Sequence, residues 1–280
     1  MFNQNIKSPV NIPVSKIHPF EGNPYKVLDN EEMNFLIESI QQQGIISPVV
    51  VRPLENTKDE YEVISGHRRL RASVKAGLET VPAFIYAINR DEAAIMLVDS
   101  NLHREHILPS EKAFAYKLKL EAMKHQGITC GQVGHKSRDE ISDTDSGRQI
   151  QRYIRLTYLI PELLDFVDER RIAFTPAVEL SYLNEIEQAD LVEEISVCDA
   201  TPNLSQAQRL RAISREEGLT PEHIGEILAE EKANQREKIK IPAERIRRFF
   251  PKSYTTEQIE EAIVKICESR YRARQVRDSR

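Results

Sequence analysis

Three short runs rich in β-branched residues lie between residues 45 and 88: IISPVVVRPL, YEVIS and VPAFIYAI. Polar turns or helical patterns bound each run, which is typical of strands rather than of helices. Strands that are followed at once by helices place loops and helix N-termini along one edge of a small sheet. The sequence therefore predicts a mixed α/β domain over residues 1–107.

Helical patterns alternate with these strands. The first has a cap at Asp29 or Asn30 and a stop at Gly44. Its apolar residues follow helical spacing: Met33, Leu36, Ile37 and Ile40. The segment HRRLRASVKAG predicts a short helix that ends at Gly77, and a further helix begins at Asp91 and runs through DEAAIMLVDSNLHRE.

The remainder of the chain is predicted to be helical. We expect residues 108–230 to form an all-helical domain, residues 231–240 a charged linker, and residues 241–280 a small helical segment. The predicted fold class is α+β.

Charge is distributed unevenly along the chain. The formal net charge is −5, yet residues 236–280 carry 13 Lys and Arg against 7 Asp and Glu. A uniformly basic surface is excluded, but local basic patches, on which nucleic-acid binding depends, are not. No apolar run approaches the roughly 18 residues of a membrane span, and three dispersed cysteines suit a reducing compartment, so we expect a cytoplasmic protein without a membrane partner. A zinc site from His125, Cys130 and His135 would match no standard ligand spacing.

Residues 63–73, VISGHRRLRAS, place a histidine and three arginines directly after a strand and a glycine. A glycine between strand and helix lets backbone N–H groups approach a ligand, and a helix N-terminus favours an anion. Arginines in the first turn add planar donor forks that suit phosphate oxygens. The residues alone are equally consistent with a phosphate site and with arginines that are solvated or paired with acids.

The short helix is expected to have two different faces. Arg68, Arg71 and Lys75 share one face, which is free to hold an anion. Leu70 and Val74 share another face, which we expect to point into the core. The P-loop signature G-x-x-x-x-G-K-[ST] is absent from the sequence.

The segment GHRRLRA resembles the GERRxRA motif of the ParB partition-protein family. Four more segments resemble other motifs of that family and occur in the same order: IPVSKIHPFEGNPYKV, ESIQQQGIISPVVV, AGLETVPAFI and DSNLHREHILPSEKA. The resemblance is specific over about residues 11–115 and continues more loosely to about residue 220. The chain thus resembles a ParB/Noc-like protein, with a ParB N-terminal domain of sulfiredoxin-like fold followed by a helix-turn-helix domain.

The resemblance implies a site for CTP and Mg²⁺. In the family, the GERRxR and ENxxR segments grip the triphosphate. Carried over by position, the nucleotide-binding residues are Gly66, His67, Arg68, Arg69, Arg71, Asn101 and Arg104. Asn101 would lie near the metal, and Arg104 would lie on the nucleotide or at the clamp contact.

Two positions depart from the family's motifs. The glutamate of GERR is His67, a neutral hydrogen-bond donor or a pH-sensitive one, for which we expect no catalytic role. The glutamate of ENxxR, which is associated with hydrolysis in the family, is Ser100, and a hydroxyl cannot serve as a carboxylate base or metal ligand without help. Asp99 is adjacent, but one helical position turns a side chain by about 100°. We therefore expect CTP binding rather than efficient CTP hydrolysis, so that a CTPase activity is left open.

The segment RQIQRYIRLTYL presents Arg and Gln on one helical face, as a major-groove recognition helix requires. The candidate DNA-binding residues are Arg148, Gln149, Gln151, Arg152 and Arg155. Ile150, Ile154 and Tyr158 lie along the packed face. Residues 136–142 would form the first helix and residues 143–147 the turn. The alternative from the residues alone is an ordinary amphipathic helix with a solvated basic face.

The basic segment 241–280 is expected to dimerise through an apolar helix face and to hold DNA non-specifically, or to end in a disordered tail. The resemblance implies a CTP-responsive, sequence-specific DNA clamp. It would act as a homodimer on a palindromic double-stranded site in plasmid, mobile-element or chromosome partition, associated with the nucleoid and partnered by a ParA-like ATPase. The alternative is a helix-turn-helix transcriptional regulator whose ParB-like domain binds a partner without nucleotide switching. Sulfiredoxin-type reduction needs a Cys beside the His-Arg pair, and none is present, whereas a phosphotransferase or nuclease of the same fold remains open.

Overall fold

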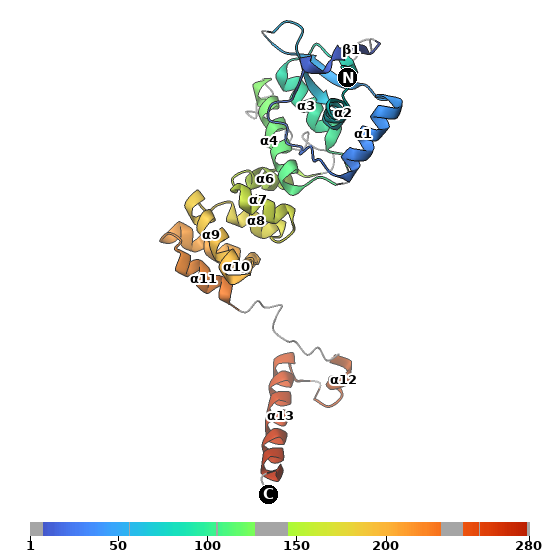
Figure 1. The fold of residues 1–280 in the computed structure, drawn as a ribbon. Coiled ribbons are helices and arrows are strands. Elements are labelled where there is room, and N and C mark those ends of the chain that lie inside the picture. The colour runs from blue at the N-terminus through green and yellow to red at the C-terminus, as the bar shows by residue number, and fades with distance from the viewer. Residues whose placement is uncertain are drawn as a thin grey trace. The chain divides into compact units, whose positions relative to one another are not determined.

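The computed structural model describes residues 8–55, 57–104, 106–126, 145–230, 243–251 and 253–278. The chain divides into two compact units, residues 1–230 and 231–280, and each is described by itself (Figure 1). The expected linker and the expected first helix of the helix-turn-helix lie outside the described residues, as do Cys130 and His135.

A five-stranded mixed sheet forms the centre of the N-terminal part. Its strands are β1 (Val10–Pro13), β2 (Ile17–Pro19), β3 (Val49–Pro53), β4 (Tyr61–Ser65) and β5 (Thr80–Ile85). Their order is β1-β5-β3-β4-β2, with antiparallel pairs β1–β5 and β3–β4 and parallel pairs β3–β5 and β2–β4. The three predicted strands are confirmed, whereas β1 and β2 were not predicted. The fold class is α+β, as predicted.

Helices cover both faces of this sheet (Figure 1). They are α1 (Glu31–Gln43), α2 (His67–Lys75), α3 (Arg90–Asn101) and α4 (Pro109–His125). Val63 and Ile64 point to opposite faces of β4 because side chains alternate along a strand. Val63 packs in one cluster with Leu70 of α2, and Ile64 packs in another with Leu97 of α3. Consequently α2 and α3 lie on opposite faces of the sheet.

The predicted boundaries of α1 are confirmed. The side chain of Asn30 accepts a hydrogen bond from the Met33 amide at 3.1 Å, and Gly44 ends the helix with a φ of 71°. Both are the expected capping arrangements.

The buried face of α2 differs from the prediction at Val74. Leu70 is buried, but the Val74 side chain is 58% exposed, while Ala72 and Ser73 are fully buried. Ala72 packs in one cluster with Met33 of α1, so small side chains let the two helices approach closely. The helix α2 is therefore rotated such that Val74 faces solvent rather than the core.

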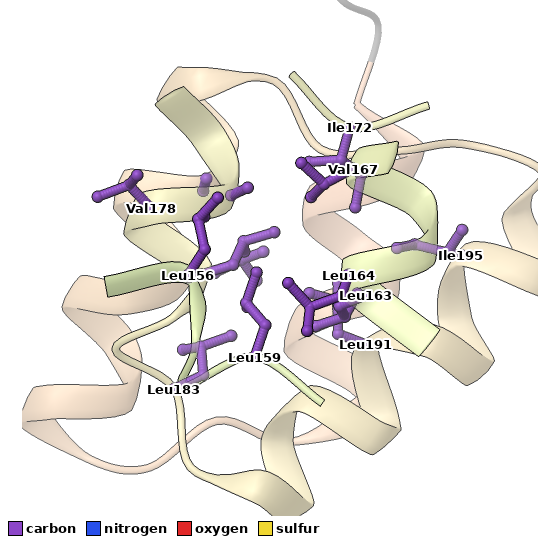
Figure 2. Close-up of a cluster of buried hydrophobic side chains, with 14 of the residues drawn as sticks. Leu156, Leu159, Leu163, Leu164, Val167, Ile172, Val178, Leu183, Leu191 and Ile195 are labelled. Atoms are coloured by element: carbon purple, nitrogen blue, oxygen red, sulfur yellow. The ribbon is translucent and has the colours of Figure 1, made fainter. Parts of the chain in front are cut away.

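The rest of the first unit is helical in its described residues, as predicted. Its helices are α6 (Gly147–Leu156), α7 (Pro161–Asp168), α8 (Phe174–Leu180), α9 (Glu185–Cys198), α10 (Leu204–Glu216) and α11 (Pro221–Ala229). Figure 2 shows the leucine-rich core that joins them, including Leu156, Leu163 and Leu191. Tyr158 was wrongly expected on the packed face of its helix and is 58% exposed, because α6 ends at Leu156 and the chain turns before Tyr158.

The second unit contains α12 (Ala243–Arg247) and α13 (Thr256–Asp278). Among the apolar residues of α13, Ile259 is buried, whereas Ile266 is 56% exposed. Across the described part of the chain, none of the helices has both the length and the apolar character that crossing a bilayer requires.

Candidate functional site

The turn between β4 and α2 depends on a glycine. Gly66 has a φ of 99°, which other residues rarely adopt, and a Cβ at this position would lie 3.0 Å from both Arg69 Nη2 and Val49 Cγ1. The first N–H groups of α2 have no acceptor within the helix and point away from its N-terminus. This strand-to-helix turn therefore leaves backbone donors and a partial positive charge available to an anion.

A cavity of about 490 Å³ lies beside α2. The helix contributes one wall: His67, Leu70, Arg71, Val74 and Lys75. The opposite side comes from β2 and the loop after it: Ile17, Pro19, Asn23 and Val27. The volume falls in the range of about 300–1,000 Å³ that is typical of small-molecule sites, and the lining combines an apolar surface with cations. This combination suits a ligand with an organic ring and an anionic group.

The loop after β2 is firmly anchored. Glu21 donates its amide to Glu62 Oε1 at 3.0 Å, and Lys26 donates its amide to Glu111 Oε1 at 2.8 Å. The side chains of Phe20 and Tyr25 are buried. Because these contacts fix both ends of the loop, this wall of the cavity is formed before any ligand binds.

His67 is a neutral side chain in this cavity. Burial, and then the charge of Arg104, lowers its pKa to about 4 against the opposing effect of Glu62. Its Nε2 atom is buried and has no hydrogen-bond partner among the described residues. Of the two roles left open by the sequence, the neutral one fits physiological pH.

Every arginine and lysine of α2 has a partner from elsewhere in the first unit. Arg69 donates through Nη1 to the backbone oxygens of Ser47 and Pro48, the latter at 2.7 Å, and burial lowers its pKa. Arg68 Nη2 lies 2.9 Å from Glu32 Oε2.

Asp29 binds the two remaining cations of this face. Arg71 donates to it through Nε at 2.7 Å and through Nη2 at 2.5 Å, and Lys75 Nζ lies 2.8 Å away. Hydrogen bonds from Arg71, then from Lys75, hold the pKa of the Asp29 carboxyl well below its usual range. The phosphate-binding face that the motif predicts is thus occupied by the chain's own carboxylates.

The end of α3 brings one of its two expected residues toward α2. Arg104 lies close enough to His67 to affect its pKa, and its guanidinium is 5.7 Å from the centre of the Tyr25 ring. Asn101 is buried and donates its Nδ2 to Leu97 O at 2.7 Å and to Ser100 Oγ at 3.2 Å.

A metal at this position would have few protein ligands. Asp99 is paired with Lys119 of α4 at 2.5 Å, so it does not replace the missing glutamate. Within the described residues, no group of three or more His, Cys, Asp and Glu side chains converges. Mg²⁺ prefers oxygen ligands and commonly takes several from a nucleotide's phosphates. Asn101 Oδ1 would be the protein ligand of such an ion and the phosphates would supply the others, although Asn101 itself does not line the cavity beside α2.

A second hollow, of about 540 Å³, runs along α13. It is lined mainly by carboxylates, which would repel a nucleotide: Glu257, Glu260, Glu261, Val264, Lys265 and Glu268.

The helix α6 begins at a serine cap, since Ser146 Oγ accepts a hydrogen bond from the Gln149 amide at 3.3 Å. Arg148 is exposed and forms no hydrogen bond or ion pair with the described residues. Arg152 donates to Thr175 Oγ1 at 3.0 Å and to Gln149 Oε1 at 3.3 Å. Gln151 is partly exposed. In the first turns of α6, Arg148 and Gln151 are therefore the polar side chains that are most available to a ligand.

Arg155 is fixed against the turn that follows α8. It donates through Nε to Ser181 Oγ at 3.1 Å and through Nη2 to Ser181 O at 2.7 Å. Its guanidinium also stacks on two rings, 4.4 Å from the centre of Tyr158 and 4.0 Å from that of Tyr182. Arg211 lies 3.6 Å from the centre of the Tyr182 ring. These contacts join α6 to α10 through Tyr182, which the sequence did not single out.

Known proteins resemble this chain in sequence. The family model of the ParB N-terminal domain matches residues 3–102. The chromosome-partitioning protein Spo0J of Thermus thermophilus is 31% identical over 202 residues, which are 72% of this chain and 70% of that protein. The nucleoid occlusion protein of Listeria innocua is 30% identical over 194 residues, or 69% of this chain, and the match spans 64% of its own length.

One solved structure is also similar to part of this chain. The C-terminally truncated chromosome-partitioning protein ParB of Caulobacter crescentus, complexed to the centromeric parS site, is similar over 72% of this chain and 98% of its own, with a TM-score of 0.43 and 20% identity. The Thermus protein establishes the family, because this chain covers more than two thirds of it at 31% identity. The chain therefore belongs to the ParB partition-protein family, together with Spo0J and the nucleoid occlusion proteins.

Proposed function

We propose that this protein is a CTP-responsive, sequence-specific DNA-binding protein that binds the nucleotide beside α2 and the DNA through α6. The observation that carries the nucleotide half is the cavity of about 490 Å³ that opens beside the GHRRLR segment. Its lining supplies apolar contacts for a base or ribose and two cations, Arg71 and Lys75, for phosphates.

Membership of the ParB family supports CTP as the ligand and residues 1–107 as its domain. The proposed contacts are Gly66, His67, Arg68, Arg69, Arg71, Asn101 and Arg104. Mg²⁺ would neutralise part of the triphosphate's charge, with Asn101 as its protein ligand. The neutral ring of His67, which lines the cavity, would contact the ligand without adding charge.

Hydrolysis is not part of the proposal. Ser100 donates its hydroxyl to Leu97 O at 3.0 Å, and Asp99 is paired with Lys119. Neither residue is placed to act as a carboxylate base on an attacking water. CTP would therefore act as a ligand that is bound and released.

DNA recognition is assigned to residues 108–230. The exposed face at the start of α6 offers Arg148, Gln149 and Gln151 for base edges and phosphates. The arginines of α6 have no carboxylate partner within the described residues, so their charge is available to a polyanion. Arg152 and Arg155 would contribute that charge while they hold α6 in place.

Membership of the family supports partition of a chromosome, plasmid or mobile element as the proposed role. The protein would act on the nucleoid, with a ParA-like ATPase as its partner. The protein would act as a homodimer, and exposed apolar residues of α13, such as Val264 and Ile266, support a dimer contact by the C-terminal unit.

Calorimetric titration with CTP and Mg²⁺ tests the nucleotide half, with and without the DNA recovered from a pull-down. We expect saturable CTP binding and CTP-dependent crosslinking of the clamp on cognate DNA. Absence of CTP binding by both the protein and its DNA complex would contradict the proposal.

One observation favours the alternative, a helix-turn-helix regulator without nucleotide switching. Arg68, Arg71 and Lys75 are all paired with carboxylates. An Arg69→Ala variant that spreads on DNA as the wild type does would support this alternative.

A further inference from the structure

Asp29 precedes the cap of α1 and was expected only to cap that helix. Its carboxylate instead reaches α2, where it accepts hydrogen bonds from Arg71 Nε at 2.7 Å and Nη2 at 2.5 Å and pairs with Lys75 Nζ at 2.8 Å. Both cations line the cavity beside α2. Asp29 therefore lies where these two side chains would otherwise meet an anionic ligand.

The contact geometry is that of a bound oxyanion. The two oxygens of Asp29 take both donors of one edge of the Arg71 guanidinium, which is the arrangement that a phosphate would use. A phosphate cannot bind this edge while the carboxylate occupies it, and two like charges at this distance repel each other. The side chain of Asp29 is 40% exposed, so it has room to leave.

We propose that Asp29 competes with the ligand's phosphates for Arg71 and Lys75 and thereby sets the affinity of the cavity. This inference rests on the proposed function for the identity of the ligand, a nucleoside triphosphate, but not for the competition itself. In the empty protein the carboxylate neutralises the two cations. A ligand with several negative charges displaces it, whereas an anion of single charge gains too little from the exchange.

Glu31 provides a matched control. It lies two positions from Asp29, is exposed, and forms no ion pair with the described residues. Glu31→Gln removes the same charge from the same end of α1 without freeing a cation of the cavity. Asp29→Asn keeps the shape of the side chain but has only one acceptor oxygen and no charge.

The test is calorimetric titration of the full chain with CTP and Mg²⁺, and in parallel with inorganic tripolyphosphate. We expect Asp29→Asn to bind CTP about fivefold to tenfold more tightly than the wild type, and Glu31→Gln to stay within about twofold of it. A misfolded variant cannot give this result, because the expected change is a gain. In Asp29→Asn combined with Arg71→Ala, the gain is expected to disappear.

The outcomes separate this inference from the proposed function. If the wild type binds CTP but Asp29→Asn binds it equally or more weakly, the competition is overturned while the nucleotide site stands. If neither binds CTP but the variant binds tripolyphosphate more tightly, the competition stands and CTP is the wrong ligand. If neither protein binds either anion, both proposals fail.

Discussion

The helices α2 and α6 each carry three arginines within ten residues, and their arginines are held in different ways. On α2, Arg68 and Arg71 are paired with carboxylates. On α6, Arg152 and Arg155 bind hydroxyls, an amide, a backbone carbonyl and aromatic rings, all of which are neutral. The first arrangement cancels charge, and the second only orients it.

The difference separates two kinds of anion site. A carboxylate partner can be exchanged for a phosphate, so a neutralised face suits a small ligand that must be admitted selectively. Neutral partners leave the positive charge of α6 in place, so we expect this helix to attract a polyanion over several ångströms, and less strongly as the salt concentration rises. The protein as a whole has a net charge of −5, so the positive charge of α6 forms a local basic patch on an acidic protein.

The largest loss of stability is expected from a substitution at the start of α2. This helix begins after a glycine with a positive φ, whereas α6 begins at a serine cap. Gly66→Ala must adopt a φ of 99° with its Cβ 3.0 Å from Val49 Cγ1. We expect the free energy of unfolding to fall by about 3 kcal/mol, measured by urea denaturation, and CTP binding to be lost. Gly77→Ala is the control, since its φ is 76° but nothing lies within 4 Å, so only about 1–2 kcal/mol of strain is expected. Equal stability of the two variants would contradict the close approach at Gly66.

Much of this part of the fold was predictable from local pattern. The strand YEVIS, the glycine after it and both ends of α1 follow from residue type and spacing alone. Strands β1 and β2 were missed because they have four and three residues and contain prolines, so only pairing with β5 and β4 defines them. Val74 was misplaced because packing of α1 against Ala72, a tertiary contact, sets the rotation of α2.

A second prediction concerns the pH dependence of stability, to which His67 in the first turn of α2 contributes. Since the folded-state pKa of His67 is lowered to about 4, the unfolded chain binds a proton below its ordinary value of 6.5 and the folded chain does not. Stability is therefore expected to fall as the pH drops from 6.5 to 4, and His67→Gln should remove roughly 2–3 kcal/mol of this loss. Urea unfolding at pH 7 and pH 4.5 measures it, with the exposed His103→Gln as control. An unchanged pH dependence in His67→Gln would show that the ring is not kept neutral by the fold.

The orientation of α6 is expected to depend on the fork of Arg155. Arg155→Lys keeps the charge but cannot make both hydrogen bonds to Ser181, so we expect about 1–2 kcal/mol less stability and weaker DNA binding. Arg148→Lys, at an exposed position, should leave stability unchanged. Tyr182→Phe should behave as the wild type, because the ring alone makes the stacking contacts. Thermal unfolding and DNA titration distinguish these variants, and a fully stable Arg155→Lys would remove the positioning role.

The smallest effect is expected at the cap of α6. Ser146→Ala removes the acceptor of the Gln149 amide, whose hydrogen bond is long at 3.3 Å, so we expect a loss of about 0.5–1 kcal/mol in urea denaturation. Nucleotide affinity should not change. A loss of unfolding free energy as large as that of Gly66→Ala would mean that stability depends equally on the first residues of the two helices.

The site was less predictable than the fold. The motif led to Gly66 and its arginines, but Asp29 lies 42 residues from Arg71, and no spacing rule connects them. Likewise the candidate contacts of α6 were read from one face of one helix, and only the fold reveals that Arg155 is held by Ser181 and Tyr182. In both cases the sequence indicates the cation, and the tertiary structure determines its partner.

The division of labour between α2 and α6 is tested most directly by one crossed experiment, in which CTP affinity and affinity for the recovered DNA, without nucleotide, are measured for Arg71→Ala and Arg148→Ala. We expect Arg71→Ala to weaken CTP binding by about tenfold or more and to leave DNA affinity within about twofold. Arg148→Ala should weaken DNA binding by about tenfold, reduce its salt dependence by about one unit of slope, and leave CTP affinity unchanged. If Arg71→Ala weakens DNA binding and leaves CTP affinity intact, the assignment of the two helices is wrong.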